Sequence, residues 1–231
     1  MTLARALSRK GSRHQANEDR YGLLDRRHHG VRRVRRGALY AVADGVSTSA
    51  GDNRAAARAA ELALECLAEF FTNQRPATEE LLLDLVETAD AQVRMTTEAA
   101  CTRTGVWLAG GVALVFNLGD SATLLYRAGV LRRITPRQVR GRGLAAYVGM
   151  GSSVRHNVFL ESLPFQKGDL FLVCSDGVFE ALSEAELHDL MDGKEEAGGL
   201  LLAEVERRLE ERGHADDATI LLVQILEVES A

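Results

Sequence analysis

Leu39-Tyr-Ala-Val-Ala-Asp44-Gly45 is an apolar stretch that ends abruptly in an acidic residue followed by glycine. The same order of residue types recurs in Val112-Ala-Leu-Val-Phe-Asn-Leu-Gly-Asp120-Ser121 and in Leu170-Phe-Leu-Val-Cys-Ser-Asp176-Gly177. Short apolar runs bounded by turn-forming residues are typical of buried β-strands. The repeated pattern therefore predicts several strands whose ends carry carboxylates at the rim of a hydrophobic core.

The sequence around these strands shows two further patterns. Residues 53–71 and 79–97 space their apolar side chains on a helical period, with charged residues between them, which predicts two long amphipathic helices. Residues 99–133 change to short β-rich runs separated by glycine-containing hairpin signals at 109–111 and 127–129. We expect a pair of helices followed by an antiparallel meander.

The C-terminal part continues the mixture of helices and strands. Ser183-Glu-Ala-Glu186 has the form of a capping box that opens a short helix, and residues 198–212 predict a longer helix. Residues 218–226 predict a final strand. Strands interrupted by groups of helices, without strict alternation of strand and helix, indicate an α+β fold with antiparallel sheets.

Composition limits the class of protein. The chain has 231 residues, 46% of them hydrophobic, with 28 Lys+Arg against 33 Asp+Glu and a net charge of −5. These values favour one globular domain over residues 1–231 and exclude a generally basic nucleic-acid coat. No run approaches the roughly 20 apolar residues that cross a bilayer, and the first residues lack a secretory apolar core, so we expect a cytoplasmic protein. Cys66, Cys101 and Cys174 are predicted to be small core residues, without disulfides or zinc.

The carboxylates at the strand ends suggest a metal site. Glu18-Asp19 and Asp216-Asp217 add further acids next to predicted strands. If these ends converge, like charges within about 4 Å repel by several kcal/mol in a partly dry site, so the cluster would need a cation. Mg²⁺ and Mn²⁺ prefer such oxygen ligands. Each acid is equally consistent with a turn or cap residue, and spacing alone does not decide between the two.

Taken in order, five short motifs resemble those of the metal-dependent protein phosphatases of type 2C, the PPM family, in its compact bacterial form. They span nearly the whole chain. The resemblance implies a four-layer αββα sandwich, in which two central antiparallel β-sheets are flanked by helices, with two Mn²⁺ or Mg²⁺ ions at one end. The motifs are Asn17-Glu18-Asp19-Arg20, Ala43-Asp44-Gly45-Val46, Asn117-Leu-Gly-Asp120-Ser121, Cys174-Ser-Asp176-Gly177-Val178 and Asp216-Asp217-Ala-Thr219.

The same resemblance implies roles for individual residues. Asp44 matches the carboxylate that bridges both metals, and Glu18 and the carbonyl of Gly45 match ligands of one of them. Asp176 and Asp216 match the acids on the other metal, and Asp19 matches the acid that holds metal-bound water. The implied activity is hydrolysis of phosphoserine and phosphothreonine in proteins by a hydroxide that bridges the metals, without a phosphoenzyme. A phosphorylated protein substrate and a counteracting Ser/Thr kinase are the implied partners.

The sequence departs from the family pattern at the position that grips phosphate. Most relatives carry an arginine five residues before the acid matched to Asp19, where this chain has His14 preceded by Arg13. We expect Arg13 and His14 to bind phosphate jointly, with an exposed histidine as the alternative. No histidine follows Asp44-Gly45, so a metal-bound water or a hydroxyl such as Ser47 or Thr48 would protonate the leaving group.

Two arginine-rich segments remain open to interpretation. Residues 135–143, which we call the flap, contain no acid. Many bacterial members of the family that this chain resembles bind a third metal with an aspartate of the flap as well as the acids matched to Asp120 and Asp176. Here a third metal would be weak or would take water in place of the missing ligand. We expect the flap to be a mobile lid whose arginines attract acidic phosphopeptides, or else a solvated loop.

Residues 26–37 hold six arginines but no aromatic residue. Nucleic-acid binding is thus less expected than an acidic docking partner or a solvated hairpin.

Three other functions are compatible with the fold or the acids. Replacement of the phosphate-binding arginine by His14 would suit a pseudophosphatase, which binds phosphoproteins with weak or no turnover. Retention of Glu18, Asp44, Asp176 and Asp216 argues against that interpretation, because a scaffold has no need for crowded acids. The second function is that of a phosphatase acting on a phosphorylated anti-sigma-antagonist protein. The third is that of a two-metal nuclease. The nuclease would need a basic channel beside the acids.

Overall fold

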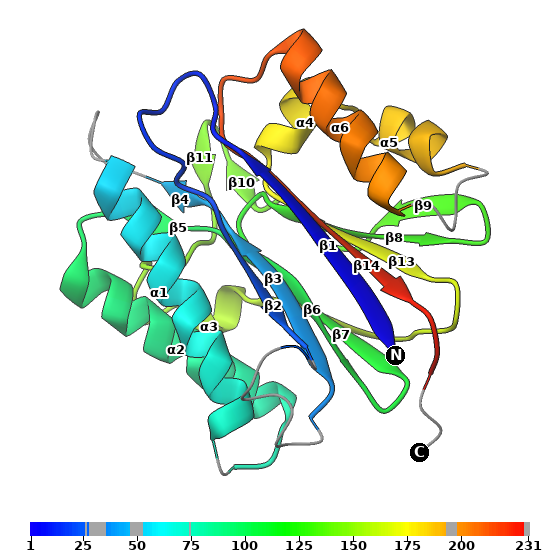
Figure 1. Cartoon of the computed structure of the whole chain (residues 1–231). Helices are drawn as coiled ribbons and strands as arrows, with labels where there is room; N and C mark the ends of the chain where they lie inside the picture. Colours follow the sequence, from blue (N-terminus) through cyan, green and yellow to red (C-terminus); the bar gives the residue numbers. More distant parts are fainter. Residues whose placement is uncertain (26, 28–35, 47–52, 74, 193–197, 229–231) are drawn as a thin grey trace.

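Two five-stranded antiparallel sheets, packed face to face, form the centre of the molecule (Figure 1). The computed structural model describes residues 1–25, 27, 36–46, 53–73, 75–192 and 198–228. The first sheet has the order β1 (Thr2–Arg9), β14 (Ala218–Ile225), β13 (Leu170–Cys174), β8 (Ala122–Arg127) and β9 (Val130–Arg133). The second has the order β12 (Phe159–Pro164), β7 (Val112–Leu118), β6 (Arg103–Ala109), β3 (Ala38–Ala43) and β2 (Arg20–Leu24).

Helices cover the outer face of each sheet (Figure 1). Helices α1 (Asn53–Thr72) and α2 (Glu79–Thr96) pack on the second sheet, and the short α3 (Val154–Asn157) lies against α2. Helices α4 (Gly177–Ala181), α5 (Glu184–Met191) and α6 (Gly198–Arg212) pack on the first sheet. The expected αββα sandwich is confirmed. None of the helices in the described ranges combines the length and apolar character that crossing a bilayer requires.

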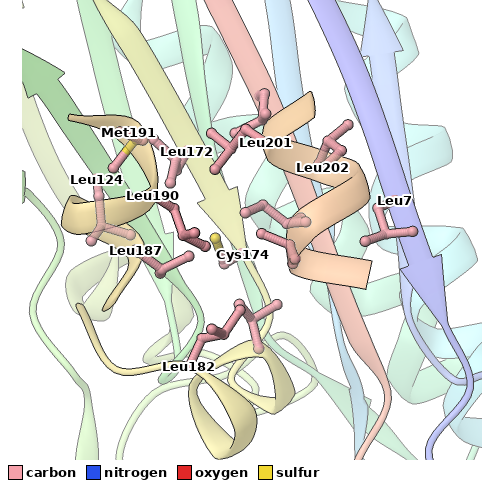
Figure 2. Close-up of a cluster of buried hydrophobic side chains, with 14 of the residues drawn as sticks. Leu7, Leu124, Leu172, Cys174, Leu182, Leu187, Leu190, Met191, Leu201 and Leu202 are labelled. Carbon is pink, nitrogen blue, oxygen red and sulfur yellow. The ribbon is translucent and has the colours of Figure 1, made fainter. Parts of the chain in front are cut away.

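Strand β13 shows why the central strands have continuously apolar sequences. Its residues Leu172 and Cys174 belong to the cluster beneath α4, α5 and α6 (Figure 2), whereas Phe171 and Val173 belong to the cluster between the sheets. A strand covered on both faces loses the alternation of apolar and polar residues that marks a half-exposed strand. Each such side chain contributes about 1.5–3 kcal/mol through burial. Cys174 is a core residue, as predicted.

The local signals in the sequence are borne out at the helix and hairpin ends. Ser183 accepts from the backbone of Glu186, and the Glu186 side chain accepts from Ser183, which completes the predicted capping box of α5. The hairpin β6–β7 turns at Gly110 and Gly111, with φ of 55° and 79°. These left-handed values suit glycine, which has no Cβ to clash with the backbone.

Two short strand pairs lie at one end of the sandwich, away from the end where β1 begins (Figure 1). Strand β4 (Gly45–Val46) pairs with β5 (Ala100–Cys101), and β10 (Val139–Arg140) pairs with β11 (Gly143–Leu144). Val148 bridges to Cys101, so the chain that leaves the flap is joined to β5 and, through it, to β4. This end of the sandwich collects the loops that carry the acids.

Candidate active site

A pocket of about 490 Å³ opens where the strand ends meet. Asp44 follows β3, Asp120 lies between β7 and β8, Asp176 follows β13, and Asp216 precedes β14. All four line the pocket, and the backbone of the N-terminal loop brings Glu18 and His14 to it. The structure therefore brings together Glu18, Asp44, Gly45, Asp120, Asp176, Asp216 and His14 from the predicted set.

Asp44 and Gly45 are fixed by backbone contacts with neighbouring elements. The carbonyl oxygen of Asp44 accepts from the amide of Thr102 at 2.8 Å, and the Asp44 amide donates to the Thr102 hydroxyl at 3.3 Å. A Cβ on Gly45 would overlap the carbonyl oxygen of Ala56 in α1. Glycine is thus required for β4 to pass this close to the helix.

Asp217 organises the N-terminal loop, a role that the sequence interpretation missed. This buried carboxylate accepts from the amides of Gly11 at 2.7 Å and Glu18 at 2.6 Å, and from Nδ1 of His14 at 2.9 Å. The motif Asp216-Asp217 indicates a function for Asp216 only. No local pattern marks Asp217, because its partners Gly11, His14 and Glu18 lie near the other end of the chain.

Asp19 lies behind the pocket and does not line it. Its Oδ2 accepts from the Ser175 hydroxyl at 2.7 Å, while the buried Oδ1 has no hydrogen-bond partner among the described residues. Burial, together with the smaller effect of the charges of Asp217 and Asp216, raises the pKa of Asp19 to about 8, although hydrogen bonds from Ser175 and Thr219 act in the opposite direction. An orphaned carboxylate oxygen at this depth is a group that a cation or its bound water would satisfy.

The pocket acids disfavour one another's charge. Burial raises the pKa of Asp44 well above its usual value, and the charges of Asp19, Asp176, Asp216 and Asp120 add to the effect. Burial also raises the pKa of Asp176 to about 6, with further contributions from Asp120 and Asp216. A divalent cation would reverse this cost, because it attracts the ionised form of every acid around it.

The donor set fits a hard divalent cation. All the pocket acids offer oxygen ligands, and the backbone of Gly45 also lines the pocket. In the present arrangement of the described residues, no three His, Cys, Asp or Glu side chains are close enough to hold a metal ion together. The individual ligand assignments therefore remain predictions.

The structure separates Arg13 from His14. His14 lines the pocket, whereas Arg13 is exposed and outside it, with its amide donating to the Ala215 carbonyl at 2.9 Å. Burial lowers the pKa of His14, but the hydrogen bond and charge of Asp217, with the charges of Glu18 and Asp216, outweigh it, so the net shift is upward. The histidine is thereby held closer to its cationic form at neutral pH.

Two flap arginines line the same pocket as the acids. Arg137 and Arg142 approach it together with Val139, Gly141 and Gly143 of the same flap. The sequence had marked this segment as arginine-rich and had not placed any one arginine at the site. Ser47, Thr48 and most of the arginine-rich stretch, residues 26 and 28–35, lie outside the described residues.

The sequence matches the family model described as Protein phosphatase 2C over residues 11–216. No curated protein matches it significantly in sequence. Among solved structures, the serine/threonine phosphatase of S. agalactiae gives a TM-score of 0.80 at 18% identity, covering 97% of this chain and 100% of that chain. PppA of Pseudomonas aeruginosa, described as a key regulatory component of T6SS, gives 0.76 at 22% identity, covering 96% and 97%.

A third structure, the catalytic domain of the serine threonine protein phosphatase PstP in complex with 2 manganese ions, gives a TM-score of 0.72 at 21% identity. It is matched over 98% of this chain and 99% of that chain. At 18–22% sequence identity, these structural similarities show that the chain shares its fold with these three proteins. Because the family model spans most of the sequence and the fold agrees with it, the chain belongs to the protein phosphatase 2C family of serine/threonine phosphatases.

Proposed function

We propose that this protein hydrolyses phosphoserine and phosphothreonine in protein substrates with the help of divalent cations. The observation that carries the proposal is the convergence of Glu18, Asp44, Asp176 and Asp216 on one pocket, from positions far apart in the sequence. The manganese ions of the PstP structure support a divalent cation for this site. Family membership supports the reaction class.

The residues that would hold two Mn²⁺ or Mg²⁺ ions are those matched by the family motifs. Asp44 would bridge them, Glu18 and the Gly45 carbonyl would complete one site, and Asp176 and Asp216 would complete the other. When bound, such ions supply the Lewis acidity that activates water and neutralises phosphate charge. The flap brings arginines to the pocket and no carboxylate, so we propose two ions and no strong third site beside Asp120.

The surrounding residues prepare this set of acids. Asp217 holds the Glu18 backbone, and Ser175 holds Asp19 through the 2.7 Å hydrogen bond. The Asp217 carboxylate also fixes the His14 ring through Nδ1. In its protonated form, a histidine oriented in this way can donate through Nε2 to a phosphate oxygen at the pocket edge. We propose His14 as a phosphate-contacting residue on these grounds.

The test is phosphate release from a phosphothreonine peptide and from p-nitrophenyl phosphate, with Mn²⁺ and with EDTA. We expect turnover with Mn²⁺, and loss of it in EDTA and in Asp44→Ala. Absence of metal-dependent turnover, with wild type and Asp44→Ala alike, would replace this proposal by the phosphoprotein-binding pseudophosphatase. The counteracting kinase, the cytoplasmic location and the single domain over residues 1–231 remain predictions.

A further inference from the structure

The pocket lining carries both signs of charge. Its acids include those at the strand ends, and the flap supplies Arg137 and Arg142. A phosphate monoester dianion that reached the acids through bound cations would still have oxygens available to the flap arginines. Arginine suits such oxygens, because its planar guanidinium donates parallel charge-assisted hydrogen bonds.

Neither pocket arginine is held in an ion pair within the described residues. Other arginines there are paired with carboxylates, such as Arg127 with Asp169 at 2.6 Å and Arg155 with Asp84 at 2.8 Å. The guanidinium groups of Arg137 and Arg142 are exposed, and the charge of Arg137 acts on Asp120 without a hydrogen bond between them. Exposed cations that line a pocket without a bonded carboxylate are available to an anionic ligand.

The N-terminal loop does not supply an arginine to this pocket. Arg13 is exposed and outside the pocket, so His14 is the only cationic side chain that the loop adds to the lining. On the basis of the proposed phosphatase function, we propose that Arg137 and Arg142 bind the substrate phosphate, and that Gln138 is the positioning residue that holds Arg137 at the correct distance from the acids.

Gln138 connects the flap to the loop that carries Asp120. Its Oε1 accepts from the amide of Gly119 at 2.8 Å and from Nδ2 of Asn117 at 3.3 Å, and its Nε2 donates to the Asn157 carbonyl at 2.8 Å. The Gln138 amide also donates to the Gly119 carbonyl at 3.0 Å. Since Gly119 immediately precedes Asp120, these bonds fix Arg137 relative to a pocket acid.

The chain that leaves the flap is held as well. Asp90 of α2 is buried, and its Oδ1 accepts from the amides of Gly149 at 2.7 Å and Gly151 at 3.1 Å. Between the flap and these glycines, Val148 exchanges backbone hydrogen bonds of 3.1 and 2.8 Å with Cys101, the strand partner of Gly45. Gln138 thus ties the flap to Gly119, and Val148 ties the chain that follows the flap to Cys101 and, through it, to Gly45 of β4.

The experiment compares single alanine variants in steady-state kinetics with a phosphothreonine peptide and Mn²⁺. Arg137→Ala and Arg142→Ala should each raise KM by about 10- to 100-fold, the range for one hydrogen bond to a charged group. The inhibition constant of inorganic phosphate should rise in parallel. Arg140→Ala is the matched control, since Arg140 belongs to the same hairpin and has the same charge but does not line the pocket. Its KM should stay within about twofold of wild type.

The role of Gln138 is tested by comparing the change in KM with the change in kcat, and by a conservative substitution that should restore part of the function. Gln138→Ala should raise KM several-fold while far-UV circular dichroism and the melting transition remain those of a folded protein. Gln138→Glu keeps the two acceptor bonds to Gly119 and Asn117 but sets a carboxylate oxygen against the Asn157 carbonyl, so it should recover only part of the loss. An unchanged KM in Gln138→Ala would show that the side chain does not position the arginine.

A phosphopeptide-binding measurement keeps this inference separate from the proposed function. If wild type shows no metal-dependent turnover, the proposed function fails, and fluorescence anisotropy with a labelled phosphothreonine peptide still tests the arginines. Weaker binding by Arg137→Ala and Arg142→Ala than by Arg140→Ala supports the inference. Unchanged KM and binding in both pocket variants, or a larger defect in Arg13→Ala, would overturn it.

Discussion

The carboxylate of Asp217 accepts a hydrogen bond of 2.6 Å from the backbone amide of Glu18, joining two residues that lie 199 positions apart. The same carboxylate also receives hydrogen bonds from Gly11 and His14. One buried side chain thus sets the conformation of the loop that brings Glu18 to the pocket.

Asp217→Asn should weaken metal-dependent activity. The amide group would place a donor against one of the backbone amides that now donate to Asp217, so the loop with Glu18 would lose its fixed position. We expect the Mn²⁺ concentration for half-maximal activity to rise about 10-fold or more, as is usual for groups that orient metal ligands. A titration of activity with Mn²⁺ measures this. Asp189→Asn, in which an exposed carboxylate is changed, should match wild type, and an unchanged titration for Asp217→Asn would contradict the role.

The pH dependence of stability should reveal Asp19 in the metal-free protein. Burial raises the pKa of Asp19 to about 8 from the usual 3.8, so the folded state holds the proton more tightly than the unfolded state. The stabilisation from that proton is complete below about pH 4 and is lost as pH rises toward 8. Asp19→Asn, which cannot ionise, should gain on wild type across this window by up to about 1.4 kcal/mol per pH unit.

Urea unfolding in EDTA between pH 5 and pH 8 measures that difference. The control Glu210→Gln, which changes an exposed carboxylate of α6 outside the pocket, should follow wild type at every pH. If the difference between Asp19→Asn and wild type stays constant or shrinks as pH rises, Asp19 is ionised in the folded metal-free protein.

Arg103 should be a source of instability. Its guanidinium is fully buried, NH1 donates to the Ala63 carbonyl at 3.1 Å, and the other nitrogens have no hydrogen-bond partner among the described residues. Burial lowers its pKa to about 10, so it is still charged at neutral pH. Arg103→Met should stabilise the fold by about 1–3 kcal/mol, because replacing a buried charge with an apolar side chain of similar length removes the desolvation cost.

The melting temperature of Arg103→Met checks this prediction. Arg58→Met is the control, as Arg58 lies on the exposed face of α1 and pairs with Glu61; little change is expected there. A lower melting temperature for Arg103→Met would mean that the buried guanidinium makes favourable interactions that outweigh its desolvation.

Gly45→Ala should impair both folding and turnover. The added methyl group would overlap the Ala56 carbonyl of α1, so either the helix or β4 must move. We expect a loss of about 1–3 kcal/mol of stability, the usual range for overpacking, and a drop in kcat. Gly22→Ala provides the comparison, since a Cβ at Gly22 meets no atom within 4 Å. Equal effects of the two substitutions on the melting temperature and kcat would show that the close approach at Gly45 is unimportant.

Features of the fold that depend on a few neighbouring residues could be predicted from the sequence. Apolar runs that end in acids located Asp44, Asp120 and Asp176, and the Ser183 capping box and the Gly110 hairpin depend on neighbouring residues alone. Arg103 shows where such patterns fail. It lies in a strand buried on both faces, so no alternation marks which side chains are inside, and its burial is set by packing against α1.

The site was only partly predictable for the same reason. Family motifs indicated the acids, yet the separation of His14 from Arg13 depends on the hydrogen bond to Asp217 near the other end of the chain. The position of Arg137 depends on contacts between Gln138 and Gly119, which come from different secondary-structure elements. Side-chain contacts between distant segments leave no periodic signal in the sequence.

The central claim is that acids from four separate segments form one site for a pair of divalent cations. Isothermal titration of the metal-free protein with Mn²⁺, comparing wild type with Asp44→Ala, tests it most directly. The account predicts two Mn²⁺ ions per chain in wild type and at most one, bound much more weakly, when the bridging carboxylate is removed. Absence of Mn²⁺ binding in wild type, or the same stoichiometry and affinity in both proteins, would contradict it.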